Sequence, residues 1–477
     1  MRSVNLSFYT LLIIHFIFII TCILLNSEFH AAESHSHKVK YLPGFDGPLP
    51  FSLETGYIGV ERGDIQLFYY FFESENNPKE DPLLVWLPGG PLCSGMSAIL
   101  YEIGPIQLED TDNFEILPKV ILRQYSWTKS ASILFMDSPV GTGYSYGTTT
   151  HAKYTGDFKA SRNLNEFLRK WLLNHPQFLS NALYLGGDSY SGFPLPLYFV
   201  DMISGNENGL QPYLNLKGYI LGNPATDKLI DGNYQVAFAH GMGFISDEFY
   251  ESIQRTCGGK YQMVDESNKE CKKQIKTFEW GLIGITTVMV IENYCNIKSL
   301  RLPEISHTNR RLVVDNDKNM LHPKQLGAFN CRYERYLLSP RWMNDVSVRE
   351  ALHVRKEPFV EWKRCNYNLS KYSYEILSSV PYHVKLSAKG FRSLIYSGDH
   401  DIIVPFLGTQ AWIRSLNYSI VDDWRRWVVD NQVAGFTRTY ANRMTFATVK
   451  GGGHTAPEYK PKECASMFRR WIQGEPL

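Results

Sequence analysis

A serine set between small residues, directly after a short apolar run, constrains this chain more than any other feature. The run is Ala182-Leu183-Tyr184-Leu185, and Gly187-Asp188-Ser189-Tyr190-Ser191-Gly192 follows it. Small residues on both sides allow a sharp turn from a strand into a helix, with the Ser189 hydroxyl at its tip. The pattern therefore predicts a nucleophile elbow. A turn that merely packs a helix against a strand is the alternative for this motif taken alone.

A base and a carboxylate are needed as well, because a serine hydroxyl is a poor nucleophile until its proton is removed. Asp401 follows the strand-like run Leu394-Ile395-Tyr396, and His454 lies in the glycine-rich residues 451–457. The order serine, aspartate, histidine is the chain order of α/β-hydrolases. We therefore predict that Ser189, Asp401 and His454 form a catalytic triad.

A donor site for a negatively charged oxygen is predicted upstream. Acyl transfer passes through an oxyanion that backbone N–H groups stabilise, each by roughly 3 kcal/mol. The apolar run 83–87 reads as a buried strand, and Pro88-Gly89-Gly90-Pro91 follows it. Because glycine has no Cβ, an N–H group here can turn toward Ser189. We expect Gly90 and Tyr190 to supply the two donors, although a plain strand-ending turn remains an alternative.

Six motifs, in this order, make the chain resemble the plant serine carboxypeptidase-like proteins. They are residues 86–95, residues 137–146, the Ser189 elbow, residues 342–352, the Asp401 segment and the His454 loop. The resemblance covers nearly the whole chain after the first 30 or so residues. It implies an α/β-hydrolase fold, with a mostly parallel central sheet, helices on both faces and an inserted helical cap. It also implies an acyl-serine intermediate and carriage through the secretory pathway, to the cell exterior or the vacuole.

Two chemistries occur in that family. Its carboxypeptidases hold a peptide's C-terminal carboxylate with an asparagine before the two glycines and a glutamate before the nucleophile, where this chain has Pro88 and Asp188. Proline offers neither a side-chain amide nor an N–H group. The Asp188 motif resembles instead the branch that uses glucose esters as acyl donors. We expect an acyltransferase with a small-molecule donor and acceptor, and with Gly89 and Asp188 contacting substrate; a carboxypeptidase acting on a peptide C-terminus is the alternative.

A third possibility is a member of this family with little or no activity and a binding role. It rests on Pro88 and on Leu92, which stands in the oxyanion segment where the family usually has glycine. A lipase-like esterase is not supported, because the sequence has no long exposed apolar lid.

The chain divides into four segments. Residues 1–32 read as a signal peptide, with Arg2 before an apolar stretch and Ala31-Ala32 after it, although an uncleaved signal anchor competes. Residues 33–227 and 322–477 carry the hydrolase pattern. Residues 228–321 break it and read as the cap insertion; excision of part of it, near residues 309–311, is an open alternative. After signal cleavage we expect no stable membrane association.

Cysteines and sequons indicate an oxidising compartment. Without Cys22, seven of the eight cysteines remain, so at least one thiol is free. The resemblance implies bridges from Cys93 to Cys331 and from Cys257 to Cys271, whereas the family's third bridge, at Cys295, is altered or absent. Glycosylation sequons occur at Asn368 and Asn417.

Charge and composition exclude several partners. The 49 basic and 48 acidic residues leave a net charge of +1, so no field favours nucleic acid or a membrane surface. A hydrophobic content of 44% over 477 residues is ample for one large core. No C-x-x-C motif occurs, and His35-Ser36-His37 is a weak metal candidate, so we predict neither a metal nor a cofactor. The sequence does not indicate an oligomeric state.

Overall fold

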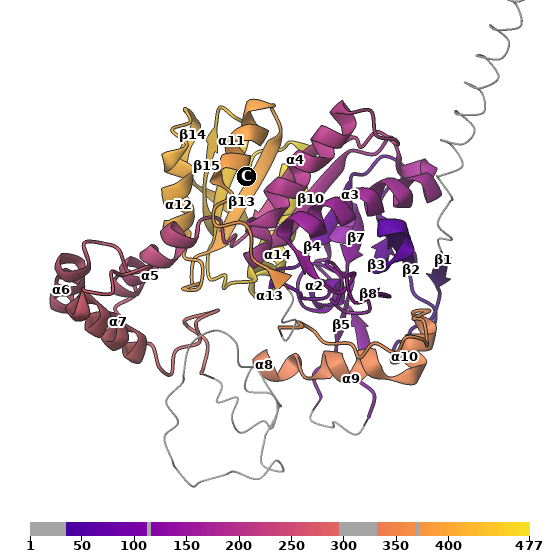
Figure 1. Cartoon of the computed structure of the whole chain (residues 1–477), viewed down its shortest axis with the longest axis horizontal. Helices are drawn as coiled ribbons and strands as arrows, with labels where there is room; N and C mark the ends of the chain where they lie inside the picture. Colours follow the sequence, from indigo (N-terminus) through magenta and orange to yellow (C-terminus); the bar gives the residue numbers. More distant parts are fainter. Residues whose placement is uncertain (1–34, 112–115, 295–331, 368–371) are drawn as a thin grey trace, which may run out of the picture.

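A single large sheet forms the centre of the computed structural model, which describes residues 35–111, 116–294, 332–367 and 372–477 (Figure 1). The predicted signal peptide lies outside these residues. The twelve strands of the sheet are β1 (His35–Val39), β2 (Leu53–Val60), β3 (Ile65–Phe72), β4 (Leu83–Leu87), β7 (Ser132–Met136), β8 (Tyr146–Gly147), β10 (Leu183–Asp188), β11 (Leu216–Gly222), β13 (Arg392–Gly398), β14 (Ile420–Val429), β15 (Gln432–Tyr440) and β16 (Met444–Val449).

The middle of this sheet is parallel. The strand order is β1-β2-β3-β7-β4-β10-β11-β13-β16-β15-β14, with β8 beside β3. All pairs from β7 to β16 are parallel, whereas the pairs on both flanks are antiparallel. Every residue of β4 and β7 is buried, as expected of parallel strands covered on both faces. The carboxyl ends of β10, β13 and β16 therefore meet at one edge of the sheet.

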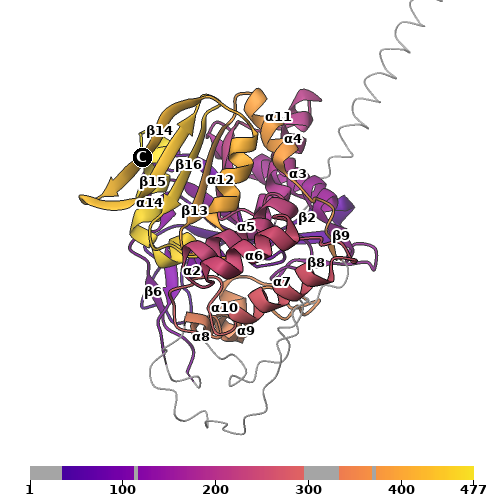
Figure 2. The same ribbon diagram turned by 90° about the vertical axis from the view of Figure 1, so that its left-hand side faces the viewer.

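Helices cover both faces of the sheet (Figures 1 and 2). On one face lie α3 (Asp157–Asn174), α4 (Pro194–Glu207), α11 (Val380–Ala388) and α12 (Phe406–Ser415). On the other lie α2 (Gly95–Tyr101), α9 (Leu338–Asn344), α10 (Val346–Ala351) and α14 (Pro461–Gln473). Each face contributes its own apolar core. The shorter elements are β5 (Ile106–Leu108), β6 (Val120–Leu122), β9 (Thr155–Gly156), β12 (Tyr372–Ser373), α8 (Arg332–Arg335) and α13 (Ala456–Tyr459).

A helical insertion projects from the side of the sheet (Figure 1). It contains α5 (Lys228–Gly241), α6 (Asp247–Cys257) and α7 (Lys269–Gly281), and a third apolar cluster lies within it. Side chains cap the three helices at their N-termini, namely Asp227, Ser246 and Asn268. The predicted boundaries 228–321 stay a prediction, because residues 295–331 lie outside the described part. Among the helices that are described, none has the length and apolar character to cross a membrane.

Candidate active site

Ser189 lies at a strained turn between β10 and α4. Its backbone φ is +52°, in the left-handed region that a residue with a side chain rarely adopts. The turn is tight on both sides: a Cβ on Gly187 would lie 2.4 Å from the Leu87 carbonyl oxygen, and one on Gly192 would lie 2.5 Å from that of Ala225. The small residues are thus required where the sequence has them, and they leave Ser189 at the tip of the turn.

The three residues of the predicted triad come together in one hydrogen-bonded chain. His454 Nε2 lies 2.7 Å from Ser189 Oγ, and His454 Nδ1 lies 2.7 Å from Asp401 Oδ2. Since an ionised carboxylate only accepts, Nδ1 carries the proton toward Asp401 and Nε2 is left to accept from the Ser189 hydroxyl. Asp401 is fully buried and also accepts hydrogen bonds from Asn223 Nδ2 and from the N–H groups of Ile403 and Val404.

The groups around His454 stabilise the imidazolium ion that forms when His454 takes the Ser189 proton. Burial lowers the pKa of His454, but the carboxylate of Asp401 outweighs burial through its charge and hydrogen bond, and Asp188 adds to it. The net pKa therefore lies above the ordinary histidine value. A base with this bias can take a proton from Ser189 and hold it while the hydroxyl oxygen attacks.

Residues 287–290, which follow α7 in the insertion, form backbone hydrogen bonds with the two loops that carry Asp401 and His454. The Val288 carbonyl accepts the His454 backbone N–H at 2.7 Å. The Thr287 carbonyl accepts the N–H of Ile402 at 3.2 Å, and the Val290 N–H donates to the His400 carbonyl at 3.0 Å. We call residues 287–290 the strap. Sequence reasoning missed it, because backbone hydrogen bonds leave no residue-type signal.

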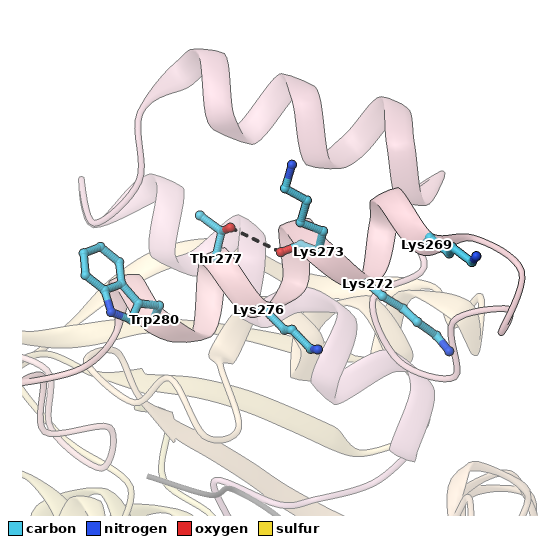
Figure 3. Close-up of a pocket in the computed structure, with 6 residues that line it drawn as sticks. All are labelled: Lys269, Lys272, Lys273, Lys276, Thr277 and Trp280. Carbon is cyan, nitrogen blue, oxygen red and sulfur yellow. Dashed lines mark hydrogen bonds between the residues drawn. The ribbon is translucent and has the colours of Figure 1, made fainter. Parts of the chain in front are cut away.

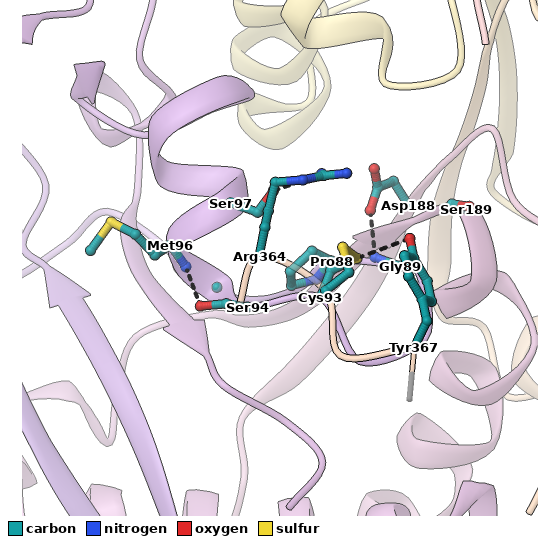
Figure 4. The surroundings of a disulfide bond; sticks show 12 residues. Pro88, Gly89, Cys93, Ser94, Met96, Ser97, Asp188, Ser189, Arg364 and Tyr367 are labelled. Atoms are coloured by element: carbon teal, nitrogen blue, oxygen red, sulfur yellow. Dashed lines mark hydrogen bonds between the residues drawn. A yellow bond between two sulfur atoms is a disulfide. The ribbon is translucent and has the colours of Figure 1, made fainter. Parts of the chain in front are cut away.

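Gly89, the first of the two glycines after β4, lies directly against the Ser189 turn (Figure 4). A Cβ on Gly89 would lie 2.6 Å from Ser189 Cβ and 2.9 Å from Tyr190 N. Gly90 has a φ of +115°, which glycine alone adopts readily. The two peptides predicted as oxyanion donors, those of Gly90 and Tyr190, thus belong to segments in direct contact. The Gly89 N–H itself donates to Asp188 Oδ1 at 2.9 Å.

A match to a known family accompanies this geometry. A sequence model of the serine carboxypeptidases matches residues 43–474. The chain belongs to the serine carboxypeptidase family. Serine carboxypeptidase-like 19 of Arabidopsis thaliana is 49% identical over 480 residues, which cover 99% of this chain and 100% of that protein. Serine carboxypeptidase-like 2 of the same plant is 50% identical over 440 residues, which cover 92% and 93%.

A solved structure of this family has the same fold. Kex1Δp, a prohormone-processing carboxypeptidase from Saccharomyces cerevisiae, matches with a TM-score of 0.71 at 20% identity, over 92% of this chain and 95% of that one. This match confirms the predicted α/β-hydrolase fold. Family and fold together make the protein a carboxypeptidase-like enzyme.

The disulfide bond in the oxyanion segment differs from the predicted one. Cys93 bonds to Cys365, so the expected pairing with Cys331 is wrong; Cys331 and Cys295 lie outside the described residues. Cys93 and Cys365 face each other in an antiparallel bridge, in which Ser94 N–H donates to the Arg364 carbonyl and Asn366 N–H to the Leu92 carbonyl. This pairing of backbones selects the partner. The predicted Cys257–Cys271 bond is present, and Cys464 is free and buried.

Leu92 lies in a backbone conformation that glycine adopts more readily. Its φ is +71° and its side chain is buried. A residue with a side chain in this left-handed region costs roughly 1–2 kcal/mol relative to the right-handed one. The leucine contributes apolar burial in return, and its backbone carbonyl still accepts from Asn366.

A pair of buried carboxyl groups lies behind the nucleophile. Burial raises the pKa of Asp188, and it raises that of Glu102, at the end of α2, well above the usual range. The guanidinium of Arg364 acts in the opposite direction on both groups. Asn223, Glu102 and Arg364 were not predicted; the position of Asn223 immediately after β11 was the one available signal.

Other predicted features lie away from this site. Asn417 is exposed directly after α12, whereas Asn368 lies outside the described residues. In the described residues, no group of three or more His, Cys, Asp or Glu side chains is arranged to hold a metal ion. A cavity of about 510 Å³ lies along α7, lined by Lys269, Lys272, Lys273, Lys276, Thr277 and Trp280 (Figure 3). These residues include neither a base nor a nucleophile of the predicted triad.

Proposed function

We propose that this enzyme transfers an acyl group from a glucose ester to an acceptor hydroxyl through an acyl-Ser189 intermediate. Ser189 Oγ attacks the ester carbonyl while His454 takes its proton and Asp401 holds the imidazole. The N–H groups of Gly90 and Tyr190 stabilise the oxyanion. His454 then returns the proton to the departing glucose oxygen as the ester bond breaks.

The second half-reaction repeats these steps in reverse. An acceptor hydroxyl attacks the acyl-serine carbonyl, His454 takes the proton of that hydroxyl, and Ser189 recovers its own proton as the bond to the acyl group breaks. Water in place of the acceptor would give hydrolysis by the same path. The chemistry of the triad is therefore common to transfer and hydrolysis, and the choice depends on which nucleophile the site admits.

The observation that carries the proposal is the set of donors beside Ser189. The Gly89 N–H donates to Asp188 at 2.9 Å, so this donor is already in use. Pro88, at the position of the carboxypeptidase asparagine, has no N–H and no amide. Asp188 is also one methylene shorter than the glutamate that the family's carboxypeptidases have at this position. A neutral ester donor meets neither difficulty.

The second candidate function is a serine carboxypeptidase. Arg364 favours this second function, because its positive charge acts to lower the pKa of both Asp188 and Glu102 and is therefore close to the site. A guanidinium is the side chain best suited to bind a carboxylate, and Arg364 would then replace the missing asparagine as the group that holds a peptide C-terminus.

A side-by-side assay separates these functions. Purified protein is incubated with a blocked dipeptide and with a panel of glucose esters plus candidate alcohols, and Ser189→Ala is the control. Acyl transfer without peptide cleavage, abolished in Ser189→Ala, is expected. Efficient release of C-terminal residues would refute the acyltransferase assignment. Failure of a phosphonate to label Ser189 would instead indicate a member of the family with a binding role.

The same proposal places the enzyme in the secretory pathway, with the cell exterior or the vacuole as its destination. Two disulfides among the described residues and the exposed sequon at Asn417 support this placement. Loss of a glycan from Asn417→Gln in protein purified from plant cells would test it, and an unmodified asparagine in the wild type would count against it.

A further inference from the structure

We propose that Asp157 is a positioning residue for the acylation step. It fixes the ring of Tyr190, the residue after the nucleophile, and thereby the direction of the Tyr190 backbone N–H. The inference rests on the proposed function of Ser189 and adds a residue that acts through another, without touching substrate.

Asp157 is the first residue of α3, and its carboxylate is completely buried. Its Oδ1 accepts from the hydroxyls of Tyr190 at 2.9 Å and Tyr372 at 2.6 Å. Its Oδ2 accepts from the N–H groups of Glu375 at 2.8 Å and Ile376 at 3.0 Å. A carboxylate has about four acceptor sites, so this group is fully used.

These bonds join three distant parts of the chain. Tyr372 belongs to β12, which pairs with β9 just before Asp157. The rings of Tyr190 and Tyr372 meet edge to face with centroids 6.0 Å apart, and Tyr190 meets Tyr374 in the same way at 5.6 Å. Burial and the charge of Asp157 both raise the pKa of Tyr190. Its hydroxyl therefore keeps its proton and remains a donor.

The turn at Ser189 gives this anchor its importance. A residue in the left-handed region persists where its surroundings over-determine it. On one side, Ser189 is held by β10, whose neighbours are β4 and β11. On the other side, Tyr190 follows at once, and its ring is tied to Asp157. The Ser189 carbonyl, in the same peptide as the Tyr190 N–H, accepts from the Ala225 N–H at 2.9 Å. Without the ring anchor this peptide can still tilt about that hydrogen bond, and a misplacement of about 1 Å in a reacting site costs on the order of 100-fold in rate.

Two matched variants test the role. Tyr190→Phe and Tyr372→Phe each delete one hydroxyl that donates to the same Asp157 oxygen, and each keeps its ring. The measurement is the single-turnover rate of acylation by p-nitrophenyl acetate. We expect Tyr190→Phe to lower the maximal acylation rate about 10-fold with little change in the half-saturating ester concentration, a fraction of the full misplacement cost. Tyr372→Phe should stay within about twofold, although a similar loss of thermal stability is expected for both.

Asp157→Asn tests the same positioning role by changing the acceptor in place of the donors. One amide oxygen cannot serve all four donors, so the acylation rate should fall at least as far as in Tyr190→Phe, in protein whose circular dichroism is unchanged. Equal rates in Tyr190→Phe and wild type would overturn the positioning role while leaving the triad intact. Equal losses in the two tyrosine variants would reduce Asp157 to a structural residue. Wild-type protein that shows no acylation would overturn both this inference and the proposed function.

Discussion

Replacing Gly89 by alanine tests the contact between the oxyanion loop and the nucleophile. The added methyl group would lie 2.6 Å from Ser189 Cβ, 2.7 Å from the Asp188 carbonyl oxygen and 2.9 Å from Tyr190 N. Ordinary contact begins near 3.4 Å, so the two segments must separate by about 0.8 Å along the shortest of these distances. Gly89 has no positive φ, so alanine adds no backbone strain and the whole effect is this displacement.

The expected consequence is a loss of rate with the fold retained. Removing one oxyanion donor typically costs roughly 100- to 1000-fold in kcat, and a displacement near 1 Å has a comparable effect. We therefore expect the acylation of Ser189 by p-nitrophenyl acetate to fall at least 100-fold in Gly89→Ala. The rate of labelling by a phosphonate, which needs the same donors, should fall in parallel.

Gly241→Ala is the matched control. Gly241 ends α5, and a Cβ there would meet nothing within 4 Å. Both variants should have similar circular dichroism, and Gly241→Ala should keep the wild-type rate. Gly89→Ala with a rate within threefold of wild type would refute the reasoning, because it would show that the loop tolerates displacement from Ser189.

Three further predictions concern charge and covalent links. In a pH–rate profile, kcat/KM should fall on the acid side with a midpoint above pH 6.5, because the pKa of His454 is raised and the base must be neutral. Asp401→Asn should move this midpoint to lower pH and reduce kcat by about 10³- to 10⁴-fold. His175→Ala should lower the free energy of unfolding by about 1–3 kcal/mol in urea at pH 7, because it removes a hydrogen-bond partner, 2.8 Å away, from the buried carboxylate of Glu54, which keeps only the Tyr69 hydroxyl as a side-chain donor. Burial raises the pKa of Glu54, but His175 outweighs burial and the net pKa is lowered. Wild type should therefore keep this stabilisation above pH 4.5 and lose it as the pH falls through the lowered pKa. The stacking of His175 on Trp171 is lost at every pH, so a difference between the two proteins that is as large at pH 2 as at pH 7 would contradict the assignment. Replacing both Cys93 and Cys365 by alanine should lower the free energy of unfolding by about 5–6 kcal/mol, because the bond closes a loop of 272 residues. Replacing Cys257 and Cys271, which are 14 residues apart, should lower it by about 3 kcal/mol. Equal urea midpoints for the two double variants would contradict this loop-entropy argument.

The triad could be predicted because its members follow parallel strands. Ser189 comes after β10, Asp401 after β13 and His454 after β16. Parallel order sends the carboxyl ends of these strands to one edge of the sheet, so residue type and strand position together indicate that the side chains meet. The contact of Gly89 with the Ser189 turn follows from the same strand order, and the oxyanion role of Gly90 and Tyr190 stays a prediction.

The supporting contacts could not be predicted, because they join residues far apart in the sequence without a pattern of residue types. Asp157 reaches Ile376 across 219 positions. The partner of Cys93 depends on which backbone segment lies beside residue 93, and a cysteine count cannot choose between Cys331 and Cys365. The strap acts through carbonyl and N–H groups that every residue possesses.

The Cys93–Cys365 bond has a consequence for the integrity of the chain. A single cut between residues 294 and 332 would leave Ser189 on one fragment and both Asp401 and His454 on the other. Cys93 belongs to the first fragment and Cys365 to the second, so the fragments would remain one molecule under oxidising conditions and separate on a reducing gel. The strap would stay with the serine fragment and still hydrogen-bond the loops of its complement. Ser189 and its two partners would thus stay joined by one covalent link and by backbone hydrogen bonds, including those between β11 and β13, after such a cut.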